Sequence, residues 1–139
     1  MNMGKTKLKV KGILLDLDGT IVDSKEAYAE AARTAFAAMG QRTADIKIVT
    51  EIPKRLEQNL PINDIVKGIN VQKFLEIYLK AYYQVTSVKT RPVRNISGTL
   101  KKLSQKAKLA LITMRCVPKN EITEELEKFG LAKYFQCVI

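Results

Sequence analysis

The sequence has no histidine and only two cysteines among its 139 residues. Without histidine, the chain cannot form a Ser-His-Asp or Cys-His catalytic site, or a zinc site with histidine ligands. Cys116 and Cys137 are too few, and too far apart in the sequence, for a metal knuckle or a disulfide framework. Because this cysteine usage does not require an oxidising compartment, we predict a protein of the reducing cytoplasm.

Long apolar runs are missing as well. No stretch reaches the ~18 apolar residues that a membrane-spanning helix needs. The basic first residues could imitate a secretory signal, but Asp16 and Asp18 interrupt the apolar segment behind them. We therefore expect no membrane partner.

Acidic residues are scarce relative to basic ones. The chain has 14 Asp and Glu against 24 Lys and Arg, which gives a formal net charge of +10. Such a charge is compatible with a nucleic-acid partner. However, the lysines are scattered along the chain with few aromatic residues between them, so a solvated lysine-rich surface is favoured and nucleic acid is not expected to be a partner.

Against this background, one motif organises the chain. The apolar run Ile13–Leu15 predicts a strand over residues 8–17 that is buried on both faces of a parallel sheet. Asp16 and Asp18 lie at its end, and residues two apart on a strand point to the same side. Both carboxylates are therefore predicted at the carboxyl end of the strand, where open α/β sheets bind their ligands.

Two ionised carboxylates at close range repel each other, and a shared proton or a bound cation relieves the repulsion. Oxygen ligands at the open edge of a sheet suit Mg²⁺ better than Ca²⁺. The alternative is an edge strand that ends in an ordinary Asp-Gly turn. That alternative requires neither the second aspartate nor the apolar run, so a functional carboxylate pair is favoured.

The run Asp16-Leu17-Asp18-Gly19-Thr20 after an apolar strand resembles the first motif, D-x-D-G-T, of the haloacid dehalogenase-like (HAD) superfamily of phosphohydrolases. The resemblance implies that Asp16 is the nucleophile and that Asp18 is the general acid and base. It also implies that the Asp16 carboxylate and the Asp18 backbone carbonyl hold Mg²⁺. The expected activity is hydrolysis of a small phosphorylated metabolite through an aspartyl-phosphate.

A second apolar stretch, residues 108–113, ends in the hydroxyl of Thr113 and resembles the second HAD motif. By that resemblance, the Thr113 hydroxyl and the Met114 backbone N–H hold phosphoryl oxygens. Arg115 follows, and its guanidinium could pair with a phosphate or a substrate carboxylate. A surface salt bridge is an equally good interpretation of Arg115.

Roughly 65 residues separate the two motifs, which is long for a crossover between parallel strands. Helical spacing predicts a helix from about residue 25 to Gly40, a short helix over 63–68 and a helix over 71–85. Residues 41–61 are predicted to be irregular, because Pro53 and Pro61 break any long helix.

This arrangement resembles HAD enzymes of the phosphoglycolate phosphatase and β-phosphoglucomutase type, which carry a helical cap between the first two motifs. The predicted fold is α/β, with a Rossmann-like core made from residues 1–20 and 92–139. Residues 21–91 are predicted to be a helical cap with hinge linkers, which closes over the site and excludes water.

The third strand of the core is predicted over residues 136–139, at the end of the chain. HAD enzymes take a phosphate-binding lysine and further acidic metal ligands from later segments. We therefore expect a piece of a longer protein that is inactive alone, and whose first strand is an open edge able to pair with a second copy. The alternative from another class is a non-catalytic phosphate- or protein-binding module of HAD ancestry.

Overall fold

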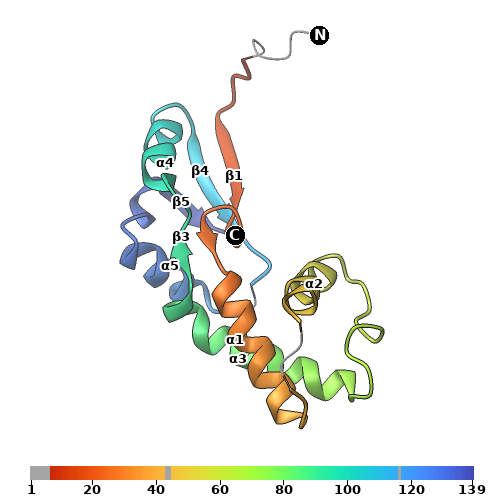
Figure 1. The fold of residues 1–139 in the computed structure, drawn as a ribbon. Helices are drawn as coiled ribbons and strands as arrows, with labels where there is room; N and C mark the ends of the chain where they lie inside the picture. Colours follow the sequence, from red (N-terminus) through yellow and green to blue (C-terminus); the bar gives the residue numbers. More distant parts are fainter. Residues whose placement is uncertain (1–6, 43–44, 116) are drawn as a thin grey trace.

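A computed structural model describes residues 7–42, 45–115 and 117–139. Its centre is a parallel sheet in the order β1 (Gly12–Asp16), β4 (Lys108–Ile112) and β5 (Phe135–Val138) (Figure 1). Asp16 pairs with Ile112 in the register, so the residues that follow β1 and β4 meet at one end of the sheet. The predicted α/β class is confirmed.

The first strand differs from its prediction in two ways. It begins at Gly12, because its partner β4 begins opposite at Lys108, and Leu8 before it is exposed. The prediction that the strand is buried on both faces is also wrong, since Leu14 is 60% exposed. Among the described residues, β1 is an edge strand and its sheet packs its core on one face.

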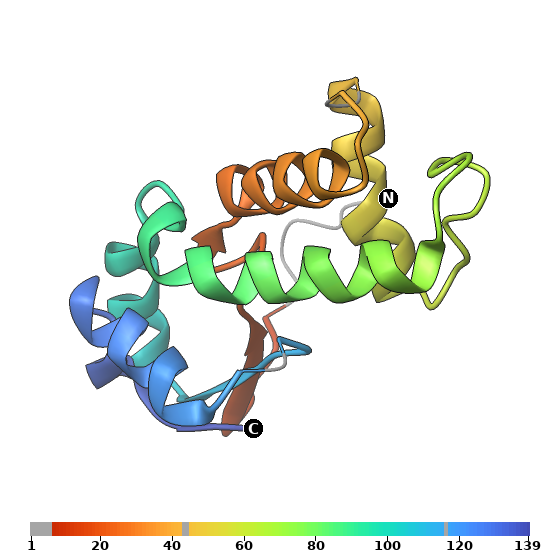
Figure 2. The same cartoon turned by 90° about the horizontal axis from the view of Figure 1, so that it is seen from below.

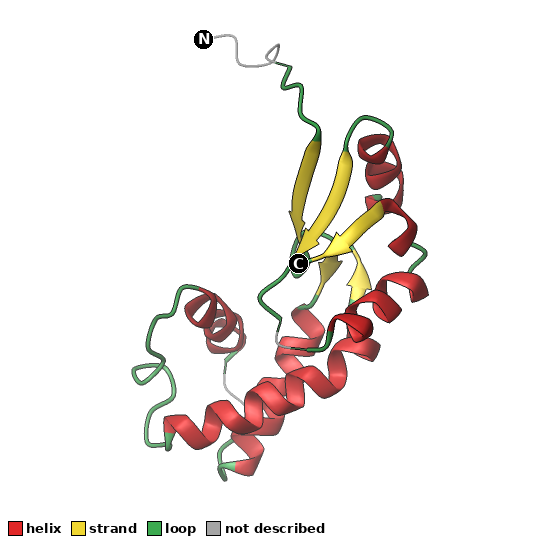
Figure 3. Cartoon of the chain, turned by 180° about the vertical axis from the view of Figure 1, so that it is seen from behind, coloured by secondary structure: helices red, strands yellow, loops and turns green. Residues whose placement is uncertain are grey.

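That packed face is covered by α4 (Ile96–Ser104), α5 (Lys119–Lys128) and a short 3₁₀ helix, Ala132–Tyr134 (Figure 3). The apolar side chains of this face form one buried cluster, which we call the core cluster. Its buried members are Leu17, Ile21, Val22, Leu100, Leu109, Leu111, Ile122, Leu126 and Leu131.

A second buried cluster, the cap cluster, joins α1 (Lys25–Ala38), α2 (Ile46–Glu57) and α3 (Val71–Lys89). Helices α1 and α3 lie side by side and run in opposite directions (Figure 2). They can approach closely because α1 turns small residues such as Ala31 and Ala35 toward α3. Aromatic rings fill the remaining space, and the centroids of Phe36 and Phe74 lie 4.9 Å apart.

Helix α2 corrects the prediction that residues 41–61 are irregular, because it continues through Pro53. An interior proline costs about 3 kcal/mol. Burial of Val49 and Ile52 in the cap cluster offsets that cost, at roughly 1.5–3 kcal/mol for each side chain. The Asp45 carboxylate also accepts a hydrogen bond from the Lys47 N–H and caps the helix.

The short helix predicted over residues 63–68 is absent there, and this described segment consists of turns. The Ile65 and Val66 N–H groups both donate to the Ile62 carbonyl, and the turn ends without continuing. Gly68, with φ of 72°, adopts the left-handed conformation that stops further helix.

Two short strands connect the sheet to the helices. Strand β2 (Val22–Asp23) pairs with β3 (Arg91–Pro92) in an antiparallel ladder. Helix α3 reaches this ladder because it extends to Lys89, beyond its predicted end at residue 85. In the part of the chain that the structure describes, no helix is both long and apolar enough to cross a membrane.

Candidate active site

A cavity of about 190 Å³ lies at the carboxyl end of β1 and β4. All five residues that the sequence predicted for the site line it: Asp16, Asp18, Thr113, Met114 and Arg115. The parallel register explains this convergence, because the two strands end side by side. The opposite wall comes from the helices of the cap cluster, chiefly α2 and α3.

The turn after β1 sets the position of Asp18. The Leu17 side chain is fully buried in the core cluster, and its carbonyl accepts hydrogen bonds from the N–H groups of Thr20, Ile21 and Val22. Gly19 makes the turn possible with φ of 81°, a left-handed value that a side chain would disfavour. Asp18 is therefore held in a rigid turn beside the cavity.

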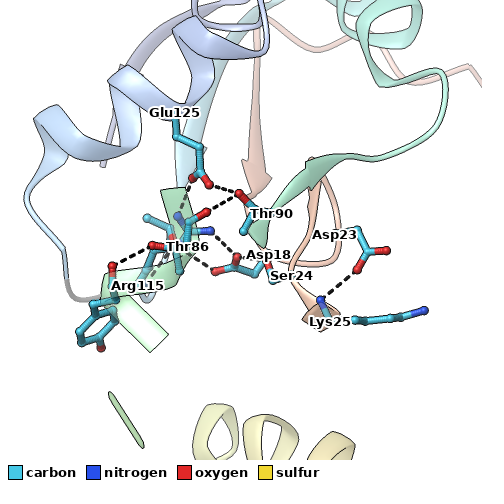
Figure 4. A network of polar contacts seen from close by, with 10 residues as sticks. Asp18, Asp23, Ser24, Lys25, Thr86, Thr90, Arg115 and Glu125 are labelled. Atoms are coloured by element: carbon cyan, nitrogen blue, oxygen red, sulfur yellow. Dashed lines mark hydrogen bonds and ion pairs between the residues drawn. The ribbon is translucent and has the colours of Figure 1, made fainter. Parts of the chain in front are cut away.

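Three donors point at the Asp18 carboxylate (Figure 4). Arg115 donates from Nη2 at 2.6 Å and from Nε at 3.3 Å, and the Ser24 hydroxyl also donates. An ionised carboxylate only accepts hydrogen bonds, so this is the partner set of the charged form. Residues 97 positions apart in the sequence thus meet in one ion pair.

Arg115 is buried, and the interpretation of it as a surface salt bridge is wrong. Its side chain is 2% exposed, and its Nη1 donates to Glu125 at 2.5 Å while the other donors face Asp18. Burial by itself lowers the pKa of Arg115, but the hydrogen bond and ion pair with Asp18 raise it above its ordinary value. The guanidinium therefore stays charged between two carboxylates.

Glu125 extends this network toward the link between the cap helices and the sheet. The Thr90 hydroxyl lies within hydrogen-bonding distance of both the Glu125 carboxylate and the Thr86 carbonyl. Thr90 ends α3 and directly precedes β3 (Figure 4). One chain of buried polar groups thus connects the end of α3 with the carboxylate in the cavity.

The second motif residues lie where β4 ends. The Thr113 hydroxyl oxygen accepts a hydrogen bond from the Arg115 N–H at 3.1 Å, so its own hydrogen remains available to donate. Met114 is 83% exposed at the cavity rim. These positions are compatible with the predicted contacts from Thr113 and Met114 to a phosphoryl group.

The wall that the helices of the cap cluster contribute was not predicted from the sequence. Tyr28 and Tyr82 stack with centroids 4.6 Å apart, and Tyr78 packs nearby. Burial raises the pKa of Tyr28 to about 12 and also raises those of Tyr78 and Tyr82. At helical spacing these tyrosines are indistinguishable from ordinary core residues, so no sequence signal marked them.

Glu57 is the other missed residue. It lies at the end of α2, in the segment predicted to be irregular, and it lines the cavity. Partial burial raises its pKa, and the charges of Asp16 and Asp18 raise it further. The charges at the end of β1 therefore act on the carboxylate at the end of α2.

The donor atoms at the end of β1 are oxygens, which are the ligands that Mg²⁺ prefers. The Asp18 carboxylate is occupied by Arg115 and Ser24, so the Asp16 carboxylate and the Asp18 backbone carbonyl are the donors available for a metal. Within the described residues, no group of three or more acidic, cysteine or histidine residues could hold a metal ion. Mg²⁺ commonly binds one or two carboxylates and keeps several water ligands, so a set of two is chemically reasonable.

Comparison with known proteins places this geometry in context. The model of the family described as haloacid dehalogenase-like hydrolase matches residues 13–139. A phosphoglycolate phosphatase of Vibrio parahaemolyticus is 29% identical over 96% of this chain and 62% of its own length. A phosphorylated carbohydrates phosphatase of Thermotoga maritima is 27% identical over 94% of this chain and 61% of its own length.

Solved structures agree on the fold. A haloacid dehalogenase-like hydrolase from Streptococcus pneumoniae superposes with a TM-score of 0.72, at 19% identity, over 94% of this chain and 60% of that protein. The chain thus spans only about three fifths of the length of these relatives.

Proposed function

Because the chain belongs to the haloacid dehalogenase-like hydrolase family, we propose that it carries the nucleophile and phosphate-binding residues of a Mg²⁺-dependent phosphatase for small metabolites. The observation that carries the proposal is the single cavity in which β1 and β4 bring Asp16, Asp18 and Thr113 together. The cytoplasm is the proposed location, and a phosphate ester is the proposed ligand.

The chemistry follows from the roles of the two aspartates. An Asp16 carboxylate oxygen attacks phosphorus, and the bond from phosphorus to the leaving alcohol oxygen breaks, which leaves an aspartyl-phosphate. Asp18 gives a proton to the leaving oxygen. In the second step Asp18 takes a proton from water, the water oxygen bonds to phosphorus, and the bond to Asp16 breaks. General acid and base catalysis of this kind contributes ~10²–10⁴-fold.

The hydrogen bonds around Asp18 bear on these two steps differently. Arg115 and Ser24 hold the ionised carboxylate, which is the form that accepts a proton in the second step. For the first step Asp18 must carry a proton, so one of these donors has to give way. Thr113 would donate its free hydroxyl hydrogen to a phosphoryl oxygen, beside the Met114 N–H. A bound Mg²⁺ would balance the charge of the phosphoryl group.

We also propose that residues 21–91 act as a cap over a core made from residues 1–20 and 92–139. The separate cap and core clusters support two packing units, and the β2–β3 ladder supports a hinge between them. Ile21 and Val22 belong to the core cluster, so the moving part would begin after β2. Closure would exclude water from the cavity.

The test is phosphoryl transfer to the chain itself. The first step, which leaves the phosphoryl group on Asp16, can be followed separately from complete turnover. Incubated briefly with Mg²⁺ and a small acyl phosphate, the 139-residue chain should gain one phosphoryl group, measured as an intact mass. Asp16→Asn should abolish the gain, because an amide is a poor nucleophile. Asp23→Asn is the matched control, since Asp23 is exposed and outside the cavity. Labelling that survives Asp16→Asn would rule out the covalent mechanism.

A non-catalytic phosphate-binding module is the second candidate. It is favoured by the lack of an acidic metal cluster among the described residues. A module of this kind would bind phosphate near Thr113 and never acquire the covalent label. The same mass measurement, paired with a phosphate titration, separates the two.

A further inference from the structure

The end of the sheet opposite the candidate active site carries a concentration of positive charge. Residues 1–15 and 77–120 contain no Asp or Glu, although both stretches contain several basic residues. The lysines are scattered along the sequence, but the fold brings some of them together where the strands begin. Lys11 directly precedes β1, Lys108 is the first residue of β4, and Lys133 lies in the 3₁₀ helix that leads into β5.

These three lysines and Lys106 line a hollow of about 730 Å³, which we call the lysine hollow. No acidic residue is among the described residues that line it. The Lys108 N–H donates to the Lys11 carbonyl at 3.0 Å, so the two lysines lie on neighbouring strands, whose backbones are ~4.8 Å apart.

The charges of the lysine hollow are not balanced within the part of the chain that the structure describes. None of its four ammonium groups forms an ion pair with a described carboxylate. The Lys133 ammonium lies 5.3 Å from the centroid of the Tyr134 ring, which leaves its charge unneutralised. Like charges held this close repel each other, and a bound anion would relieve the repulsion.

Part of the basic character of this region has an explanation that needs no ligand. Lys101 and Lys102 lie in the last turn of α4, where cations stabilise the partial negative charge of a helix end. Lys11 and Lys108 stand at the beginning of strands, and strands have only small net dipoles. The helix dipole therefore does not account for the lysines at the strand ends.

The size and lining of the lysine hollow limit which anion fits it. Its volume lies within the roughly 300–1,000 Å³ typical of sites for small molecules. The amides of Gln105 and Gln136 and the hydroxyl of Ser104 add hydrogen-bond donors to the lining. Lysine binds phosphate as a point charge on a flexible stem, so exposed lysines can follow the oxygens of a ligand. Four such cations favour a ligand with several adjacent phosphate groups over one with a single phosphate.

The same lining argues against a strand of nucleic acid. Proteins that bind single strands combine a basic groove with aromatic side chains on which successive bases stack. Tyr134 is the one aromatic side chain among the described residues that line the lysine hollow. A compact ligand is therefore favoured over a long one.

We propose that the lysine hollow binds a small soluble molecule with two or more adjacent phosphate groups, such as an inorganic or a nucleoside triphosphate. Lys11 and Asp16 lie at opposite ends of β1, about 16 Å apart at the rise of a strand. The site is therefore separate from the candidate active site, and it does not depend on the proposed function.

The experiment is a calorimetric titration of the 139-residue chain at physiological ionic strength, where weak contacts with exposed charges are screened. Mg²⁺ is left out, because it binds the phosphates of the ligand. Inorganic triphosphate should bind at least about tenfold more tightly than orthophosphate. Amide NMR signals should shift at Lys108 and Lys133 rather than at Thr113. Tighter binding of adenosine triphosphate than of inorganic triphosphate would identify a nucleotide as the ligand, and equal affinity would identify the phosphate chain alone.

Paired variants separate a specific site from general charge. Lys108→Gln combined with Lys133→Gln should weaken triphosphate binding by about tenfold, as expected for two exposed charge contacts. Lys47→Gln combined with Lys73→Gln removes the same charge from exposed positions outside the lysine hollow and should change the affinity by less than about twofold. Circular dichroism should show the same melting temperature for both pairs and the parent, because all four lysines are exposed.

Four results would overturn the inference. Orthophosphate could bind as tightly as triphosphate, the two pairs of variants could weaken binding equally, or the NMR shifts could be confined to the region of Thr113. The fourth is an oligothymidylate strand that binds more tightly than triphosphate, which would assign the region to nucleic acid. None of these measurements uses phosphoryl transfer, so a failure here is distinguishable from a failure of the proposed function.

Discussion

Replacing Arg115 by methionine should destabilise this chain more than any surface change of similar size. The side chains of Arg115 and Glu125 are each 2% exposed, and their charges compensate each other at 2.5 Å. Arg115→Met leaves Glu125 buried with the Thr90 hydroxyl as its described partner and removes two hydrogen bonds from Asp18. Breaking a buried pair from one side costs about 3–5 kcal/mol.

The expected shift in melting temperature follows from chain length. At about 2.1 cal/mol/K per residue, 139 residues give an unfolding entropy of about 0.29 kcal/mol/K. A loss of about 3–5 kcal/mol then lowers the melting temperature by about 10–17 °C. Since the free energy of unfolding of small domains is only about 5–15 kcal/mol, this loss would remove a large part of it.

Thermal unfolding followed by circular dichroism measures this shift, and two further variants sharpen it. Arg115→Met combined with Glu125→Leu removes both charges and should recover most of the loss, because apolar replacement of a buried pair is often neutral or stabilising. Arg33→Met removes an exposed pair with Glu30 and should cost less than about 1 kcal/mol. A melting temperature for Arg115→Met within about 3 °C of the parent, or no recovery in the double variant, would refute the argument.

Three other predictions use different features. The raised pKa values of Tyr78 and Tyr82 mean that, above pH 10, the unfolded chain releases protons that the folded chain keeps. The free energy of unfolding should therefore keep its full value below pH 10 and fall above it. In urea titrations of Tyr78→Phe, this fall should be smaller by about 1.4 kcal/mol per pH unit. Millimolar Mg²⁺ should shift the amide NMR signals near Asp16 and leave them unmoved in Asp16→Ala, and signals indifferent to Mg²⁺ would count against a preformed site. Because β1 is an edge strand among the described residues and Leu14 is exposed, Leu14→Lys should reduce self-association in sedimentation experiments, and an unchanged profile would point to another interface.

The sheet and its site were predictable from the sequence because their signals are local. The apolar run before Asp16 identified β1, and the run ending at Thr113 identified β4. Once both strands are placed in a parallel sheet, their carboxyl ends must meet, so the convergence of Asp16 and Thr113 followed from topology alone.

The helices of the cap cluster were predicted less well, because tertiary packing decides where they form. Local propensity argues against a helix through Pro53, and only the cap cluster, which forms after the chain has folded back, makes α2 favourable. Glu57 was missed for that reason. Arg115 was ambiguous for a similar reason, since its burial depends on Glu125 from a different helix. No spacing in the sequence encodes that pairing.

The pairing of β1 with β4 has a consequence for how the chain is made. Gly12 pairs with Lys108, which lies 96 positions later in the sequence, whereas α1 and α3 pack against each other within that interval. During synthesis at about 5–20 residues per second, β1 leaves the ribosome roughly 5–20 s before β4 leaves it. The cap cluster can assemble in that time, while β1 still lacks its partner β4. Hydrogen exchange on ribosome-bound chains stalled with α3 outside the exit tunnel and β4 still inside it should therefore show protection of α1 and α3 but not of β1.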